Sequence, residues 1–142
     1  MWLAGLITPL SERLRSHLLL DMLKEEALHR FFSGFGWPAY DENSVPDGAV
    51  LPYITYEVST DNIDSPVFLA ASLWDRSTSW RSVTAKALDI ARELDYGGVT
   101  LPYDNGVLFI TQGSPFSQRV ADDDDTIRRI MINIAAEFCS AV

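Results

Sequence analysis

Four consecutive aspartates, Asp122–Asp125, are the residues of this 142-residue chain with the most obvious capacity for chemistry. Carboxylate oxygens bind calcium, but a calcium loop of the EF-hand type needs ligands at alternate positions, a central glycine and a terminal bidentate glutamate. The run has none of this spacing. A row of like charges is typical of a solvated turn, which is the interpretation we adopt. Contact with a basic partner surface is the alternative.

Basic residues flank the acidic run on both sides. Arg119 precedes it, and Arg128 and Arg129 follow it. These side chains can neutralise part of its charge locally, although each exposed ion pair contributes little to stability. We select the four aspartates, Asp122, Asp123, Asp124 and Asp125, together with Arg128, as candidate interface residues.

No other pattern in the sequence predicts catalysis or metal binding. His17 and His29 are twelve positions apart, and neither has a cysteine or carboxylate at a known ligand spacing. The single cysteine, Cys139, excludes an internal disulfide and a cysteine metal site. The sequence has no nucleophile elbow, P-loop or dinucleotide-binding glycine pattern. We therefore predict no catalytic, cofactor-binding or metal-binding residues. An enzyme whose carboxylates meet only in the fold is left open without positive support.

The charge balance narrows the choice of partners. The chain has 11 basic and 20 acidic residues, a net charge of −9. This argues against a broad basic patch for nucleic acid and against an anionic membrane surface, whereas it permits a basic protein partner. No apolar run approaches the roughly 20 residues needed to span a bilayer, and residues 1–10 lack the basic start of a secretory signal. We expect a protein that is cytoplasmic where it is made.

The segment Phe31–Pro38 is unusual because it contains three Phe, one Trp and two Gly in eight residues. Glycines beside aromatic residues are typical of a loop whose rings fill a core or pack on a neighbour. We predict a loop that closes the end of the core. A subunit contact is the main alternative, with Phe35 and Trp37 as its candidate residues, and a ligand-stacking platform is a lesser one.

The elements that position these residues centre on a unit of about residues 52–95, predicted as strand, turn, strand and helix. Alternation over 53–58 predicts a half-buried strand, and the apolar run 67–74 predicts a central strand covered on both faces. The range Ser77–Ser79 supplies N-cap candidates for the helix. Its predicted buried face consists of Trp80, Val83, Ala87, Leu88, Ala91 and Leu94. Trp74 and Trp80 could instead stack single-stranded nucleic acid, but we interpret them as a strand end and a helix start.

The flanking regions complete the sheet. A helix is predicted over about residues 10–32, with Met22 and Leu28 on its apolar stripe, and residues 40–51 are predicted to be turn-prone. Asn105-Gly106 predicts a hairpin between 99–103 and 107–111, with Gly113–Pro115 ending its second arm. The last element, Ile127–Phe138, fits both a strand and a helix face, and its β-branched content favours a strand.

Together these elements predict one α+β domain over residues 1–142. It would have a mainly antiparallel or mixed sheet of four or five strands, with the C-terminal strands at about residues 107–138. Two helices would pack on one face of this sheet. We find no internal repeat and no domain linker in the sequence.

Several short segments occur in an order that resembles one family. They are Leu51–Tyr56, Ser72–Trp80, Gly113–Phe116, Gln118 and Asp123–Arg129. In this order they resemble the tail-terminator, or tail-completion, proteins at the head–tail joint of long-tailed bacteriophages and prophages. The resemblance covers roughly residues 50–138 and depends on order and spacing, without an invariant catalytic signature.

The resemblance implies an α+β subunit that forms a homo-oligomeric ring, commonly a hexamer, capping the tail tube and docking to the head completion or connector proteins. DNA would pass through the lumen without specific binding, and no cofactor, membrane contact or enzymatic activity would be involved. The protein would occupy the host cytoplasm during assembly and the neck or tail of the mature virion. The alternative is a small cytosolic ligand-binding or adaptor domain with no phage role, which should show one deep pocket with converging polar groups.

Overall fold

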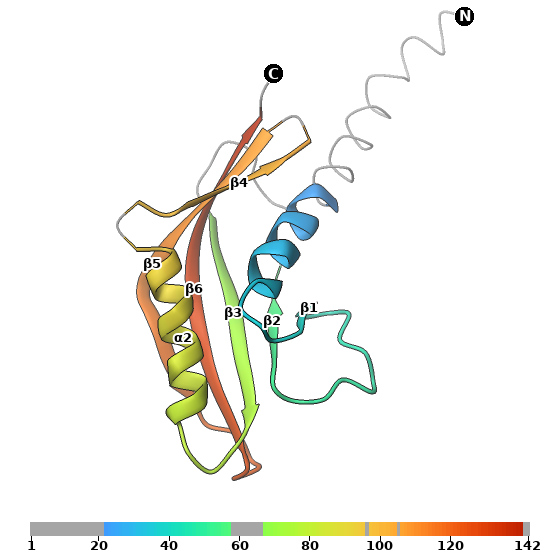
Figure 1. The fold of residues 1–142 in the computed structure, drawn as a ribbon, viewed down its shortest axis with the longest axis vertical. Helices are drawn as coiled ribbons and strands as arrows, with labels where there is room; N and C mark the ends of the chain where they lie inside the picture. Colours follow the sequence, from blue (N-terminus) through green and yellow to red (C-terminus); the bar gives the residue numbers. More distant parts are fainter. Residues whose placement is uncertain (1–21, 58–66, 96, 105, 141–142) are drawn as a thin grey trace, which may run out of the picture.

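The computed structural model describes residues 22–57, 67–95, 97–104 and 106–140, which form an α+β fold with two helices and a six-stranded mixed sheet. The first helix covers residues 22–33 of the described range, in blue in Figure 1, and the second is α2 (Arg81–Glu93). The strands are β1 (Ala39–Asp41), β2 (Tyr53–Tyr56), β3 (Val67–Arg76), β4 (Val99–Tyr103), β5 (Gly106–Val120) and β6 (Ile127–Ser140). Neither described helix is long and apolar enough to cross a membrane.

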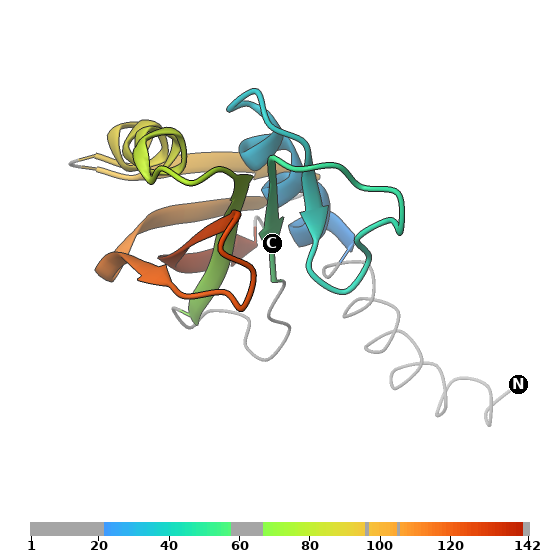
Figure 2. The ribbon, with the colours of Figure 1, turned by 90° about the horizontal axis from the view of Figure 1, so that it is seen from below.

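The sheet has the order β1-β2-β3-β6-β5-β4. β1 runs parallel to β2, and every other neighbouring pair is antiparallel. Figure 2 shows the sheet curving around the side that carries both helices. The sequence predicted four or five strands. It missed β1, because three residues are too few to show a strand period within a turn-prone segment.

β6 is one of the two central strands of this sheet. The segment Ile127–Phe138, whose sequence fits both a strand and a helix, is therefore a strand, as its β-branched content predicted. β6 pairs with β3 along ten positions, from Arg76↔Ile127 to Val67↔Ala136, and with β5 on its other side. Its alternate residues are buried under the helices: Ile130, Ile132, Ile134, Ala136 and Phe138. The period of two is therefore that of a strand with one face in the core.

β5 continues well beyond the point at which the sequence predicted its end. Gly113–Pro115 lies inside the strand, where the register with β6 shifts between Gln112 and Ser117. The bulge accommodates Pro115, which has no N–H to donate to the ladder. Asn133 Nδ2 instead donates to Pro115 O at 2.9 Å. A Cβ at Gly113 would lie 2.8 Å from Asn133 O, so the two strands can approach only because this residue is glycine.

α2 was predicted correctly as a helix, but its cap and its buried face differ from the prediction. The N-cap residue is Trp80, which makes no side-chain capping bond, while Ser79 Oγ accepts a hydrogen bond from Arg81 N at 3.1 Å. The buried residues of α2 are Val83, Ala87 and Ile90, and the C-cap residue Leu94 is buried as well. Leu88 is 48% exposed, because it lies beside the stripe that these residues form rather than on it.

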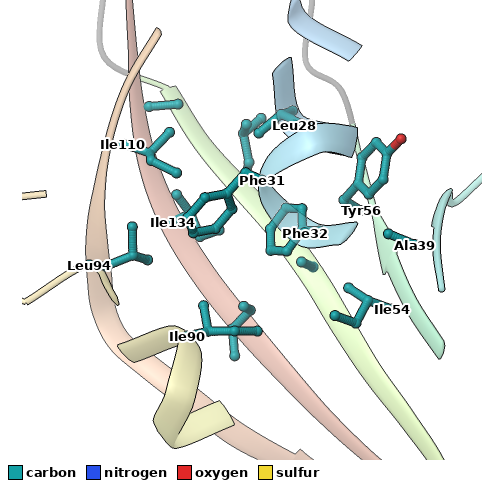
Figure 3. Packing of buried hydrophobic residues seen from close by; sticks show 14 of the residues in the cluster. Leu28, Phe31, Phe32, Ala39, Ile54, Tyr56, Ile90, Leu94, Ile110 and Ile134 are labelled. Carbon is teal, nitrogen blue, oxygen red and sulfur yellow. The ribbon is translucent and has the colours of Figure 1, made fainter. Parts of the chain in front are cut away.

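The first helix extends to residue 33, close to its predicted end at residue 32, so Phe31 and Phe32, which the predicted loop also included, belong to the helix. Both are buried, together with Ala27 and Leu28, whereas Met22 is 59% exposed and does not belong to the buried stripe. Figure 3 shows Leu28, Phe31 and Phe32 of the first helix in one hydrophobic cluster with Ile90 of α2, Leu94 just after α2, and Ile110 and Ile134 of the sheet. The two helices thus share one core on one face of the sheet. The predicted helical residues 10–21 lie outside the described residues.

No described helix lies on the other face of the sheet, which we call the helix-free face. β3 was predicted to be covered on both faces, and this is wrong for its beginning, where Phe68 is 75% exposed. On the helix-covered face its side chains Leu69, Ala71 and Leu73 are buried. The apolar residues of β3 therefore contribute both to the core and to the helix-free face.

Candidate interaction surfaces

The four aspartates lie exposed in the turn that joins β5 to β6, and two of them build the turn. Asp122 Oδ1 accepts a hydrogen bond from Asp124 N at 2.9 Å. Asp124 Oδ1 accepts bonds from the backbone N–H and the hydroxyl of Thr126 at 2.8 and 2.7 Å. Carboxylates that bond to backbone N–H groups two positions ahead are typical of Asx turns. We call residues 122–126 the acidic turn.

Asp124 also lies near a cation from the end of β3. Arg76 Nη1 is 3.7 Å from Asp124 Oδ2 and donates to Thr126 Oγ1 at 2.7 Å. The backbone hydrogen bond from Thr126 lowers the pKa of the Asp124 carboxyl below its ordinary value, and the Thr126 hydroxyl and Arg76 act in the same direction. Asp123 and Asp125, by contrast, have side chains with no hydrogen bond or ion pair to any described residue. Hydrogen bonds thus define the shape of the turn, and two of its carboxylates have no partner within the described chain.

Arg128 ties the acidic turn to the start of α2. Its Nη1 donates to Asp125 O at 2.8 Å and its Nη2 to Thr78 O at 3.0 Å. The guanidinium carbon lies 5.3 Å from the centre of the Trp80 ring, which Arg119 also approaches at 4.8 Å. These contacts give Arg128 a structural role within the chain. Its participation in an interface remains a prediction.

The aromatic loop after the first helix lies against the core. Phe35 packs edge to face on Phe31, with ring centres 5.2 Å apart, and Trp37 is half-buried. Lys86 of α2 donates to Phe35 O at 2.5 Å, and its Nζ lies 5.3 Å from the Trp37 ring. The loop therefore joins the two helices, as a loop that closes the core should. A subunit contact through Phe35 and Trp37 remains a prediction.

The helix-free face carries a row of side chains that the sequence analysis did not select. Tyr40, Tyr53, Trp74 and Arg129 lie side by side on β1, β2, β3 and β6, because Tyr53 pairs with Trp74 and Trp74 with Arg129. Ring centres are 5.7 Å apart for Tyr40 and Tyr53 and 6.4 Å for Tyr53 and Trp74. The Arg129 guanidinium carbon lies 4.5 Å from the centre of the Trp74 ring. We call these four residues the aromatic ladder.

Two small buried side chains fix the end of the ladder. Trp74 Nε1 donates to Thr55 Oγ1 at 3.0 Å, and Arg129 Nε donates to Ser72 Oγ at 3.1 Å. Thr55 and Ser72 are only 6% and 5% exposed, because the indole and the guanidinium cover them. The orientation of both large side chains is therefore set by the sheet beneath them. The alternation of Tyr53 and Thr55 was visible in the sequence, but their cross-strand partners were not.

An open cleft of about 810 Å³ lies between the first helix and β4. Its lining is Leu23, Glu25, Glu26, His29, Arg30, Pro102, Tyr103 and Asp104. Beside it, Tyr56 OH donates to Glu25 Oε1 at 2.5 Å. Burial raises the pKa of Tyr56 well above its ordinary value, and the hydrogen bond to Glu25 raises it further. In the part of the chain that the structure describes, no three His, Cys, Asp or Glu side chains gather as metal ligands could.

Comparison with known proteins adds one finding. No family model matches the chain, and no curated protein matches it significantly. Among solved structures, a chain from the virion of a native gene transfer agent (GTA) particle has a similar fold, with a TM-score of 0.59. The alignment covers 85% of this chain and 95% of the other, at 16% sequence identity. At this identity the likeness establishes a shared fold.

Proposed function

We propose that this chain is a virion structural protein of a phage or prophage, a tail terminator that forms a homo-oligomeric ring at the head–tail joint. The observation that carries the proposal is the fold shared with a chain of a gene transfer agent virion over 95% of that chain. The order of Leu51–Tyr56, Ser72–Trp80 and Asp123–Arg129, which resembles tail terminators, supports the same class. Because 16% identity conveys fold alone, the role in the particle is our inference.

The surface of the molecule supports a role in assembly. The helix-free face exposes Phe68 and the aromatic ladder, and a face of this kind is typical of protein contacts. The cleft beside the first helix, in contrast, is open to solvent, whereas a ligand pocket is deep and encloses most of its ligand. The function would therefore lie in surfaces that bind copies of this chain, the tail tube protein and the head connector proteins.

The negative net charge of the chain is compatible with a ring through which DNA passes. A ring of six copies would carry a charge of −54, six times −9. DNA would pass through such a ring without adhering, since binding depends on basic groups that displace counterions from the phosphates. The ring would assemble in the host cytoplasm and remain in the neck of the virion. Phe35, Trp37, Arg128 and the acidic turn are candidate contacts with the next subunit or ring.

The first test is the solution mass of the purified protein by light scattering over a concentration series, with negative-stain images of the largest species. Rings of about six subunits with a central hole are expected. Cosedimentation with assembled tail tubes and with head connector proteins is the second measurement. A protein that stays monomeric at high concentration and binds neither partner would contradict the proposal, and the ligand-binding alternative would then be preferred.

A further inference from the structure

Arg129 is a cation whose direction is fixed and whose outer edge has no partner among the described residues. Its Nε donates to Ser72 Oγ, and its guanidinium lies over the ring of Trp74 at 4.5 Å. Its Nη1 and Nη2 groups make no hydrogen bond or ion pair to any residue that the structure describes. A guanidinium presented in this way can bind a carboxylate through two parallel hydrogen bonds, and little side-chain entropy is lost on binding.

The residues around Arg129 have the composition of a binding hot spot in a protein interface. Tyr, Trp and Arg are the residue types most enriched among side chains that dominate binding energy. Here Tyr40, Tyr53 and Trp74 continue the row from Arg129 across four adjacent strands. The edge-to-face packing of Tyr40 on Tyr53 and the bond from Trp74 to Thr55 hold the row in place before any partner arrives.

The acidic turn carries exposed carboxylates whose charge is opposite to that of Arg129. Asp122 and Asp124 use their carboxylates in hydrogen bonds within the turn, so Asp123 and Asp125 present exposed charged groups on a hydrogen-bonded turn. Within one chain neither carboxylate lies within ion-pair distance of Arg129. The two surfaces also lie at the same end of the sheet, since Trp74 is near the end of β3 and Arg129 near the start of β6.

We propose that the aromatic ladder, through Arg129, receives the acidic turn of a second copy of this chain, with Asp123 and Asp125 as its ligands. The inference rests on the proposed ring and names its subunit contact. The contact is heterologous, because the ladder of one copy meets the turn of the next, and such contacts close into rings when the rotation permits. Complementary charges across a contact steer the encounter and fix its register, and like charges placed opposite one another there are strongly unfavourable.

The test is a charge exchange between two variants of the full chain. Arg129→Glu and the double variant Asp123→Arg/Asp125→Arg should each raise the concentration needed for half-assembly by about tenfold or more, because each brings like charges together. An equimolar mixture should assemble again. In the mixture the altered turn of one variant meets the altered ladder of the other, and the native turn meets the native ladder, so every contact again joins opposite charges. Light scattering measures the mass of each variant and of the mixture.

Matched controls separate this contact from general effects of charge or folding. Arg92→Glu makes the same change in charge on the exposed side of α2, away from the ladder, and should assemble like the unaltered chain. Circular dichroism checks that each variant is folded. Arg129→Gln, which removes the charge without reversing it, should weaken assembly less than Arg129→Glu.

Three results would overturn the inference while leaving the proposed function to its own test. The first is an unaltered chain that remains monomeric yet binds tail tubes. The second is a double aspartate variant that assembles normally while Arg129→Glu does not, since the ladder would then bind a different protein. The third is a mixture that fails to assemble although each variant is folded.

Discussion

The two faces of the sheet use the same strands for different purposes. On β6, Ile130, Ile132 and Ile134 are buried beneath the helices. The intervening side chains, such as Arg129 and Met131, lie half-exposed on the helix-free face. The first set excludes water and stabilises the fold, whereas Arg129 in the second set is held in place by a hydrogen bond to Ser72 and by the ring of Trp74. Alternate residues of one strand therefore belong to the core and to the proposed contact surface.

The contrast extends to β2, where Tyr56 and Tyr53 face opposite sides. Tyr56 stacks on Phe32 in the core, with ring centres 5.6 Å apart, and its hydroxyl donates to the half-buried Glu25 beside the cleft. Tyr53 contacts Tyr40 and Trp74 on the helix-free face. Residues of one type can therefore have different effects when they are substituted, and paired substitutions test the comparison directly.

The largest effect is expected from truncation on the covered face. Ile132→Ala should lower the free energy of unfolding by about 2–5 kcal/mol, because it leaves a cavity at a fully buried position. Met131→Ala, at the adjacent half-exposed position, should cost less than about 1 kcal/mol. Urea denaturation of both variants measures the difference. Equal losses would mean that the helix-free face is also part of a core.

The next effect concerns the buried tyrosine. Tyr56→Phe should lower stability by about 1.5–3 kcal/mol, since it removes a hydrogen bond to the Glu25 carboxylate. Tyr53→Phe should be nearly neutral, as its hydroxyl has no hydrogen-bond partner among the described residues. Thermal and chemical unfolding at neutral pH compare the two variants.

The same tyrosine should make stability depend on alkaline pH. Because burial raises the pKa of Tyr56 in the folded protein, its stabilising contribution is complete below the unfolded pKa of about 10. Above that pH the unfolded chain loses the phenolic proton first, so stability should fall by up to about 1.4 kcal/mol per pH unit from this group. Tyr56→Phe should remove this part of the slope, and an unchanged slope would contradict the assignment.

A smaller effect is expected from the anchor of the aromatic ladder. Trp74→Phe keeps a ring on the helix-free face but removes the indole N–H that donates to Thr55. Stability should fall by about 1 kcal/mol, the net value of one such hydrogen bond. Assembly should weaken as well, because Arg129 would lie on a less firmly held ring. A loss of stability with unchanged assembly would separate the ladder from the subunit contact.

The smallest effect should be local to the acidic turn. Thr126→Val removes the hydroxyl that donates to Asp124, and the pKa of Asp124 should move back toward its ordinary value. Arg76→Gln should also raise it, because the nearby Arg76 cation lowers the pKa of Asp124. Whatever stability Asp124 adds is present above the unfolded pKa of about 3.9 and is lost as pH falls toward the lower folded value. Carboxyl titration by NMR measures both shifts.

Much of the fold followed from local pattern. The period of two over β6, the helical spacing of α2 and the hairpin signal before β5 each predicted the correct element. The predictions were wrong where contacts between residues far apart in the chain decide which residues are buried or where a strand ends. Leu88 and Ile90 both suit a helix face, and the sheet beneath α2 buries only Ile90. Likewise β5 passes through Gly113–Pro115 because β6 is long enough to pair with it on both sides of the bulge.

Some of the candidate surfaces could be predicted from the sequence and one could not. The acidic turn, Phe35 and Trp37 could be selected because each lies in one short segment of unusual composition. The aromatic ladder could not, since its four residues come from separate strands between Tyr40 and Arg129. Only the strand register sets Trp74 opposite Tyr53 on one side and Arg129 on the other.

The sequence by itself determined the α+β class, the periods of the long strands and α2, and the solvated character of the acidic turn. These depend on backbone geometry and on contacts between near neighbours, which a linear pattern records. Tertiary structure decided which face of each strand the helices cover, where β1 pairs, and which side chains gather around Arg129. Those choices depend on pairing between residues far apart in the chain, and the free energy of that packing is absent from any local stretch of sequence.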